Sequence, residues 1–154
     1  VNVVVVGEIN EAPVLERVLE LASAGRLVIA TTTGNHLVAV LEHVRDLVPQ
    51  ADQERIMHLL GDVLIGVSTQ LLLPKVGGGR TLIVSNMIAT HPIKSLIREG
   101  KFDQIPNVMQ TSGEEGMITM DKALSLGVKQ GVISLQDAKV HATDINQFNV
   151  LVAH

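Results

Sequence analysis

Residues 3–8 of the chain, Val-Val-Val-Val-Gly-Glu, decide its fold. Four β-branched apolar residues in succession, residues 3–6, are typical of a strand that is covered on both faces of a parallel sheet. Glu8 follows this run, so its carboxylate is expected at the carboxyl end of the strand, where open α/β sheets bind their ligands. A loop glutamate that caps the next helix fits the same position equally well, so both interpretations stay open at this point.

Strand and helix patterns alternate after this first strand. Apolar residues recur at helical spacing over 14–22, with Pro13 in the first turn and Gly25 beyond the last. Residues 26–33 predict a second strand, and residues 37–47 predict a second helix. Short steps of this kind are the signature of βαβ units, so the sequence predicts an α/β fold with a mainly parallel sheet.

The pattern changes in the second part of the chain. Residues 51–66 predict another helix, and residues 67–75 and 80–89 predict an antiparallel hairpin around a glycine-rich turn. From there on the pattern is helical, and the predicted helices span 92–99, about 103–110, 119–130, 134–141 and 144–152. We therefore predict an α/β region over residues 1–90 and a helical region over residues 91–154.

Composition argues against several classes of protein. The chain has 154 residues, a net charge of -4 and no tract rich in Lys or Arg, which argues against nucleic-acid binding. It contains no cysteine, so disulfides, thiolate metal sites and cysteine nucleophiles are excluded. No apolar run approaches the roughly 18 residues that a membrane span requires.

Several functional motifs are incomplete in the sequence or absent from it. The run Val-Gly-Gly-Gly-Arg-Thr at residues 76–81 lacks the spacing and the Lys of a phosphate loop, so it predicts a hairpin turn. The six histidines include no pair at metal-binding spacing, and we expect no metal site. There is no G-x-S-x-G elbow of a serine hydrolase.

Three segments together resemble one family, the type IV pilus retraction (twitching motility) ATPases among the type II/IV secretion ATPases. Residues 3–9 resemble the Walker B strand of these enzymes, and residues 19–33 resemble the helix and strand that carry their histidine box. Residues 91–124 are the most specific, with Leu-Ile-Arg-Glu, Gly-Lys, Gln-Ile-Pro, Gln-Thr, Gly-Met and Thr-Met-Asp in the family's order. The resemblance runs from about Val3 to Asp137.

The resemblance implies the fold and the partners. It implies the C-terminal half of a RecA-like P-loop ATPase domain, from the Walker B strand onward, followed by the helical region. In the full-length parent it implies ATP and Mg²⁺, a homo-oligomeric ring that is a hexamer, and contact with the inner-membrane platform protein of the pilus. The expected place is the cytoplasmic face of the inner membrane, and no nucleic acid is expected as a partner.

It also implies roles for individual residues. Glu8 takes the position of the catalytic Walker B glutamate, and Gly7 precedes it at the end of that strand. Arg26 and Thr33 stand where the family has its two histidine-box histidines, and the resemblance implies that these two positions and Gly7 bind the nucleotide. The motor motif corresponds to Lys94, Leu96, Ile97, Arg98 and Glu99.

The departures from the family pattern leave a second function open. Arg26 and Thr33 replace both histidines, Asn10 replaces an arginine after Walker B, and Ile65 replaces the arginine before the hairpin. Since the phosphate loop is not in this chain, we expect the chain by itself neither to bind ATP tightly nor to hydrolyse it. The alternative is a non-catalytic, degenerate homologue that is a structural or regulatory subunit of a pilus or secretion ATPase.

Overall fold

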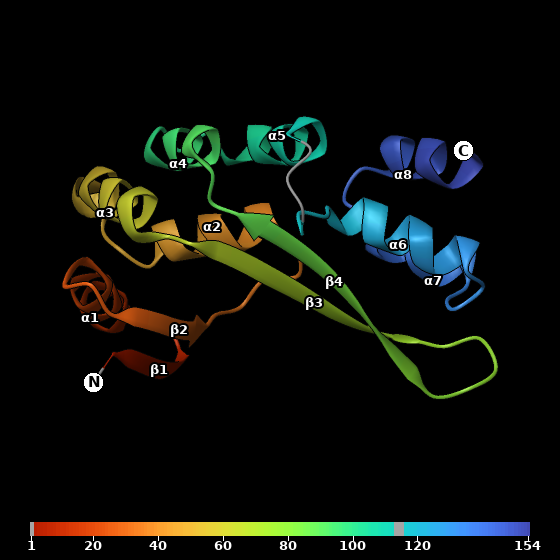
Figure 1. Ribbon diagram of the computed structural model, residues 1–154, viewed down its shortest axis with the longest axis horizontal. Helices are drawn as coiled ribbons and strands as arrows, with labels where there is room; N and C mark the ends of the chain where they lie inside the picture. Colours follow the sequence, from red (N-terminus) through yellow and green to blue (C-terminus); the bar gives the residue numbers. More distant parts are fainter. Residues whose placement is uncertain (1, 113–115) are drawn as a thin grey trace.

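The computed structural model describes residues 2–112 and 116–154 (Figure 1). Residues 113–115, which belong to the segment that resembles the pilus ATPases, lie outside the described residues. The strands are β1 (Val3–Glu8), β2 (Leu27–Thr31), β3 (Gly66–Pro74) and β4 (Arg80–Ile88). The helices are α1 (Ala12–Ser23), α2 (Leu37–Asp46), α3 (Gln50–Val63), α4 (His91–Arg98), the 3-10 turn η1 (Phe102–Gln104), α5 (Ile105–Thr111), α6 (Met120–Lys129), α7 (Leu135–His141) and α8 (Ile145–Ala153).

Strands β1 and β2 form a parallel pair joined by α1, as the sequence predicts. The prediction that the first strand is covered on both faces is wrong for this chain, because Val5 is 76% exposed and its partner Ile29 is 52% exposed. Side chains alternate between the two faces of a strand, and α1 packs on one of them. Val3, Val5, Leu27 and Ile29 lie on the other face, which we call the open face.

Strands β3 and β4 form the predicted antiparallel hairpin, in register from the Gly66–Ile88 pair to the Pro74–Arg80 pair. In the connecting turn, the Lys75 amide donates to the Gly79 carbonyl oxygen over 3.0 Å. Gly77, Gly78 and Gly79 all have positive φ angles, between 77° and 107°, which residues with a Cβ atom rarely adopt. This backbone requirement explains the three glycines without any bound phosphate.

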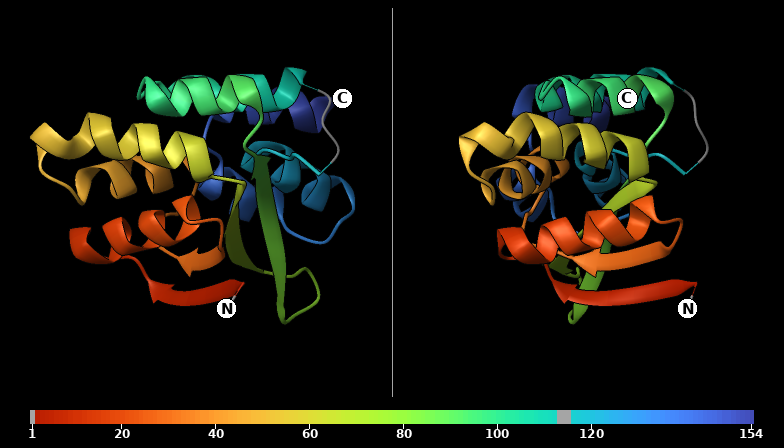
Figure 2. Two further views of the ribbon diagram at one scale, coloured as in Figure 1. Left: turned by 60° about the vertical axis from the view of Figure 1, so that its left-hand side comes forward. Right: turned by 90° about the vertical axis from the view of Figure 1, so that its left-hand side faces the viewer.

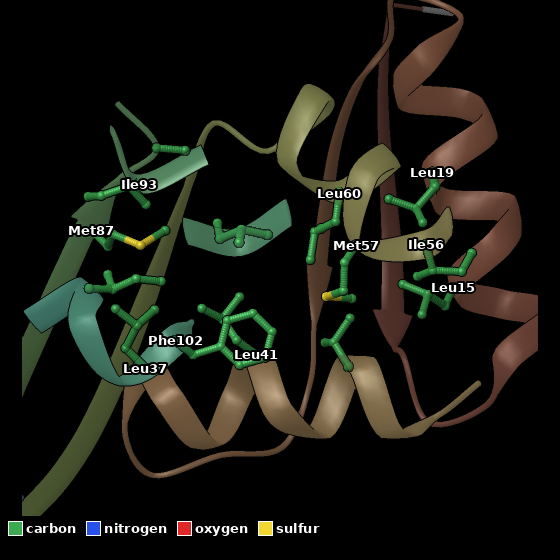
Figure 3. Close-up of a cluster of buried hydrophobic side chains, with 14 of the residues drawn as sticks. Leu15, Leu19, Leu37, Leu41, Ile56, Met57, Leu60, Met87, Ile93 and Phe102 are labelled. Atoms are coloured by element: carbon green, nitrogen blue, oxygen red, sulfur yellow. The ribbon is translucent and has the colours of Figure 1, made fainter. Parts of the chain in front are cut away.

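The buried apolar residues form two clusters, and the hairpin contributes to both. The first cluster joins α1–α5 and η1 to the open end of the hairpin, and Figure 3 shows part of it around Phe102. The second cluster joins α6–α8 to the hairpin's turn end through Leu73 and Ile83, with Phe148 fully buried. The domain boundary at residues 90 and 91 stays a prediction, because α4 and α5 pack with the helices that precede the hairpin.

The helices of the first cluster are stacked in succession away from β1 and β2. Helix α1 contacts α3, which in turn contacts α4, and Figure 2 shows this order from two further sides. None of the helices in the described part of the chain has the length and apolar character that crossing a bilayer requires.

A buried carboxylate anchors the C-terminal helix. Asp121 in α6 is 4% exposed, and its two oxygens accept hydrogen bonds from the backbone amides of Thr143 (2.7 Å) and Asp144 (3.0 Å). Asp144 then caps α8 by accepting from the amides of Asn146 and Gln147. These two hydrogen bonds offset the cost of burying the carboxylate, and they fix the turn that starts α8.

Candidate functional site

Glu8 reaches its position through a one-residue shift in the β1–β2 register. Val6 pairs with Ala30, but Glu8 pairs with Thr31, so Gly7 is an extra residue in β1. In an unshifted ladder Glu8 would lie on the α1 side with Val6, and the shift moves it to the open face. A Cβ atom on Gly7 would meet nothing within 4 Å, so close packing does not account for this glycine.

Thr33 lies beside Glu8 and is bonded to it. The Thr33 hydroxyl donates to Oε1 of Glu8 over 2.7 Å, although 25 positions separate the two residues in the chain. Two further bonds fix the same segment, because the Thr32 hydroxyl donates to the Ile9 carbonyl oxygen (3.1 Å) and the Ile9 amide donates to the Thr31 carbonyl oxygen (2.7 Å). The carboxyl ends of both strands are thus joined, with Glu8 and Thr33 exposed between them.

The loop after Thr33 packs closely on α2. A Cβ atom on Gly34 would lie 2.4 Å from Cγ2 of Val40, so a larger residue does not fit without movement. His36 caps α2, since its Nδ1 accepts from the Ala39 amide over 3.2 Å. His36 therefore serves as the N-terminal cap of this helix.

Arg26 lies at the other end of this sheet. It directly precedes β2, whereas Glu8 and Thr33 lie where the strands end. Five strand residues separate these two ends, a span of about 16 Å. The structure brings Glu8 and Thr33 together but not Arg26, whose part in nucleotide binding stays a prediction.

The motor-motif residues lie on α4 and contact α3. Ile97 is fully buried and Leu96 packs against the first cluster, as the helical spacing predicts. The guanidinium of Arg98 donates through two nitrogens to Oδ1 of Asp62, and Nζ of Lys94 donates to the Asp62 carbonyl oxygen over 3.0 Å. The two cations are therefore tied to the end of α3.

Glu99 follows the helix and forms an ion pair with Lys101 at 2.7 Å. The hydrogen bond that Lys101 donates to Glu99 raises the pKa of Lys101, and the negative charge of Glu99 acts in the same direction. Both side chains are about half exposed, so this pair is a surface interaction.

The sequence analysis did not identify the residues of α3 that contact α4. A Cβ atom on Gly61 would lie 2.7 Å from Cγ of Arg98 and 3.1 Å from the Lys94 carbonyl oxygen, so the glycine permits a close approach of the two helices. The available signal was a glycine in the interior of a predicted helix, which often has a packing reason. Asp62 had no signal in the sequence, because its partners are more than 30 positions away.

Other positions that depart from the family pattern are exposed. Asn10 is exposed after β1, and Ile65 is 69% exposed where the family has arginine. The Ile65 carbonyl oxygen accepts from the Ala89 amide over 2.8 Å, so its backbone closes the open end of the hairpin.

The described residues do not fit a complete nucleotide and Mg²⁺ site. They contain no group of three or more His, Cys, Asp or Glu side chains that could hold a metal ion. The glycine run is a hairpin turn, and Glu8 and Thr33 supply one carboxylate and one hydroxyl. No step of any reaction can be assigned to a metal bound by these residues.

Comparison with known proteins finds pilus ATPases. The chain is 33% identical over 141 residues to the type IV pilus retraction ATPase PilT of Pseudomonas aeruginosa, covering 92% of the chain and 41% of that protein. It is 32% identical over 142 residues to a twitching motility protein of Neisseria gonorrhoeae, covering 92% of the chain and 38% of that protein. The chain therefore spans about two fifths of the length of these relatives. No protein-family profile matches the chain.

Solved structures agree in fold. The crystal structure of the pilus retraction motor PilT with bound ADP matches with a TM-score of 0.83 and 34% identity, over 95% of this chain and 41% of that one. The ATPase DotB of Legionella pneumophila matches with a TM-score of 0.75 at 16% identity, which shows the fold alone. The chain is homologous, over most of its length, to a C-terminal portion of the type IV pilus retraction ATPases.

Proposed function

We propose that the chain is the back half of the ATPase core of a motor that couples ATP hydrolysis to type IV pilus retraction. The homology to pilus retraction ATPases supports this function. The observation that carries it is the position of Glu8, at the carboxyl end of β1 and turned onto the open face by the register shift at Gly7. Open α/β sheets bind their ligands at this edge, which favours a site residue over a helix cap.

Glu8 would act on the attacking water. Its exposed carboxylate can accept a hydrogen bond from a water molecule and hold it in line with the terminal phosphate of ATP, which a front half of the core would bind. Capping of α1 is not a competing role for Glu8, because the N-cap residue of α1 is Glu11 and no side chain forms a capping hydrogen bond there. By itself the chain is proposed to be inactive, because its sequence holds no phosphate loop and its described residues form no metal site.

The substitution Glu8→Gln in the longer protein that carries these residues tests this assignment. It keeps the size of the side chain but removes its charge and most of its basicity, so ATP turnover should fall by at least ~100-fold with ATP binding retained. Glu11→Gln is the matched control, because Glu11 is an exposed carboxylate three positions away without a capping bond. Turnover that is equal in Glu8→Gln and the unmodified protein would contradict the catalytic assignment.

A second candidate function is a non-catalytic subunit that assembles with a competent ATPase and regulates it. The exposed Ile65 and the replacement of both histidine-box positions, by Arg26 and Thr33, favour it. An unmodified longer protein without ATP turnover, which nevertheless changes the turnover of an added competent pilus ATPase, would establish this alternative.

The proposed setting is the one that the family resemblance of the sequence implies. We place the longer protein in a homo-oligomeric ring, a hexamer, at the cytoplasmic face of the inner membrane, in contact with the pilus platform protein. The arrangement of Lys94 and Arg98 on α4 supports a role in passing on motion, because both are tied to α3, whose buried residues share the first cluster with Ile9 after β1 and Ala30 in β2.

A further inference from the structure

We propose that Thr33 is a positioning residue that holds the Glu8 carboxylate in its working orientation, an inference that rests on the catalytic role proposed for Glu8. The resemblance assigns this position to a nucleotide-contacting histidine. The geometry assigns it a different task, because the hydroxyl of Thr33 is directed at Glu8 itself.

The contact leaves half of the carboxylate available. The bond from Thr33 to Oε1 measures 2.7 Å, which is in the range of a hydroxyl that donates to a carboxylate. No described residue donates to the other oxygen, Oε2. One oxygen is thus restrained while the second can accept from a water molecule, which is what an in-line arrangement requires.

Three backbone features bring Thr33 and Glu8 together. The extra residue Gly7 moves Glu8 to the open face of the sheet, where its partner is Thr31. Thr33 lies two positions beyond Thr31, past the end of β2, and its hydroxyl reaches Glu8 from there. The reciprocal bonds of Ile9 with this segment fix the spacing of the two chain ends.

Gly34 fixes the segment from the other side. Its close approach to Val40 holds the loop on the first turn of α2, so Thr33 is held between a strand end and a helix. An exposed glutamate has several accessible rotamers, and a donor on a fixed segment restricts them at little cost in entropy. Positioning of this kind affects turnover more than substrate affinity, because it acts when the water attacks.

The test compares Thr33→Val with Thr33→Ser in the longer protein. Thr33→Val keeps the branched shape and removes the hydroxyl, so kcat should fall about tenfold while the KM for ATP changes less than about twofold. Thr33→Ser keeps the hydroxyl and should recover most of the lost turnover. Thr33→Ala, which removes the same hydroxyl with a smaller side chain, is the second variant if Thr33→Val does not fold.

Thr143→Val is the matched control. Thr143 is an exposed threonine in the turn before α8, where its backbone amide bonds to Asp121, so the change removes a threonine hydroxyl without touching the segment of Glu8 and Thr33. A loss of kcat in Thr143→Val equal to that in Thr33→Val, or no recovery in Thr33→Ser, would overturn the positioning role. An unchanged or increased kcat in Thr33→Val together with a collapse of turnover in Glu8→Gln would overturn it as well, while leaving the proposed function intact. If Glu8→Gln has no effect, or if the unmodified protein has no turnover, the proposed function fails first and the positioning role with it.

Discussion

At the scale of single residues, the neighbouring backbone decides whether a carboxylate is exposed or buried. Glu8 owes its exposure to the extra residue before it, and Asp121 owes its low exposure to two backbone amides that come from beyond α7. Both are carboxylates, yet one is open to solvent and the other is bonded inside the fold. The difference lies in the neighbouring backbone, so the residue type by itself does not indicate the role.

Asp121→Asn should destabilise the C-terminal helices. An asparagine amide group would face one of the two backbone donors, so one bond is lost and a buried donor is left unpaired, at a cost of about 2 kcal/mol. Chemical denaturation followed by circular dichroism measures this loss. Asp103→Asn, at an exposed carboxylate in η1, is the control and should change the stability by less than about 0.5 kcal/mol. Equal stabilities of the two variants would show that Asp121 does not anchor α8.

These residue-scale features mark the limit of prediction from sequence. The position of Glu8 after an apolar run was predictable, because strand patterns place such a residue at the carboxyl end. The face on which it lies was not, because the register shift depends on pairing with a strand some 20 positions away. The bond from Thr33 depends on that shift and on the loop after β2, so sequence spacing could not reveal it.

At the scale of elements, the side chains of α4 are fixed by contacts with α3 and with the first cluster. Its apolar stripe, Ile93 and Ile97, is fully buried in the first cluster, and this was predictable from helical spacing. The resemblance implies a motor role for its cationic side chains, Lys94 and Arg98. The structure shows that Arg98 and Lys94 are bonded to the last turn of α3, which Gly61 allows to come close.

Arg98→Ala in the longer protein should impair pilus retraction and leave the fold intact. The bond to Asp62 lies near the surface, with Asp62 61% exposed, so its removal should cost about 1 kcal/mol or less. Asp62→Ala should reproduce the motility defect if the link between the two helices is what matters. Twitching motility and thermal melts measure the two effects.

Arg17→Ala is the control for this pair of variants. Arg17 forms an exposed ion pair with Glu20 within α1, so its loss removes a comparable surface interaction without touching α4. Unchanged motility in Arg98→Ala would show that α4 packs in the core without a role in pilus retraction. A defect in Arg98→Ala but not in Asp62→Ala would show that Arg98 acts on another partner.

At the scale of the whole molecule, the chain has an unpaired strand edge beside an apolar face. Among the described residues β1 pairs with β2 alone, so its other edge carries free backbone donors and acceptors. The open face adds the exposed pairs Val3–Leu27 and Val5–Ile29. Edges of this kind pair with other chains.

We therefore expect the isolated chain to self-associate through β1. Val5→Lys places a charge beside the edge and on the open face, and it should shift sedimentation toward the monomer at a concentration where the unmodified chain associates. Val140→Lys is the matched control, because Val140 is 75% exposed on α7, close to the 76% of Val5, and away from the sheet. A strictly monomeric unmodified chain, or an equal effect of both variants, would contradict association through this edge.

The general architecture was predictable, and the division of its core was not. Strand and helix periodicity predicted the parallel pair, the hairpin and the helical region after it, because each depends on local pattern. The two clusters depend on which helix returns to which end of the hairpin. That is a long-range property, and the predicted boundary after residue 90 could not include it.

The hairpin that belongs to both clusters also behaves as a mechanical tie. Its two strands run from one group of helices to the other (Figure 1), so a force that separates the groups stretches both backbones in parallel. Tension of this kind breaks none of the bonds between β3 and β4, because both strands are pulled in the same sense. The load reaches the C-terminal region through the contacts of Leu73 and Ile83 and through the backbone hydrogen bonds of Val76 and Asn86 with residues 132 and 118, so the strength of these links sets the load that the chain can transmit.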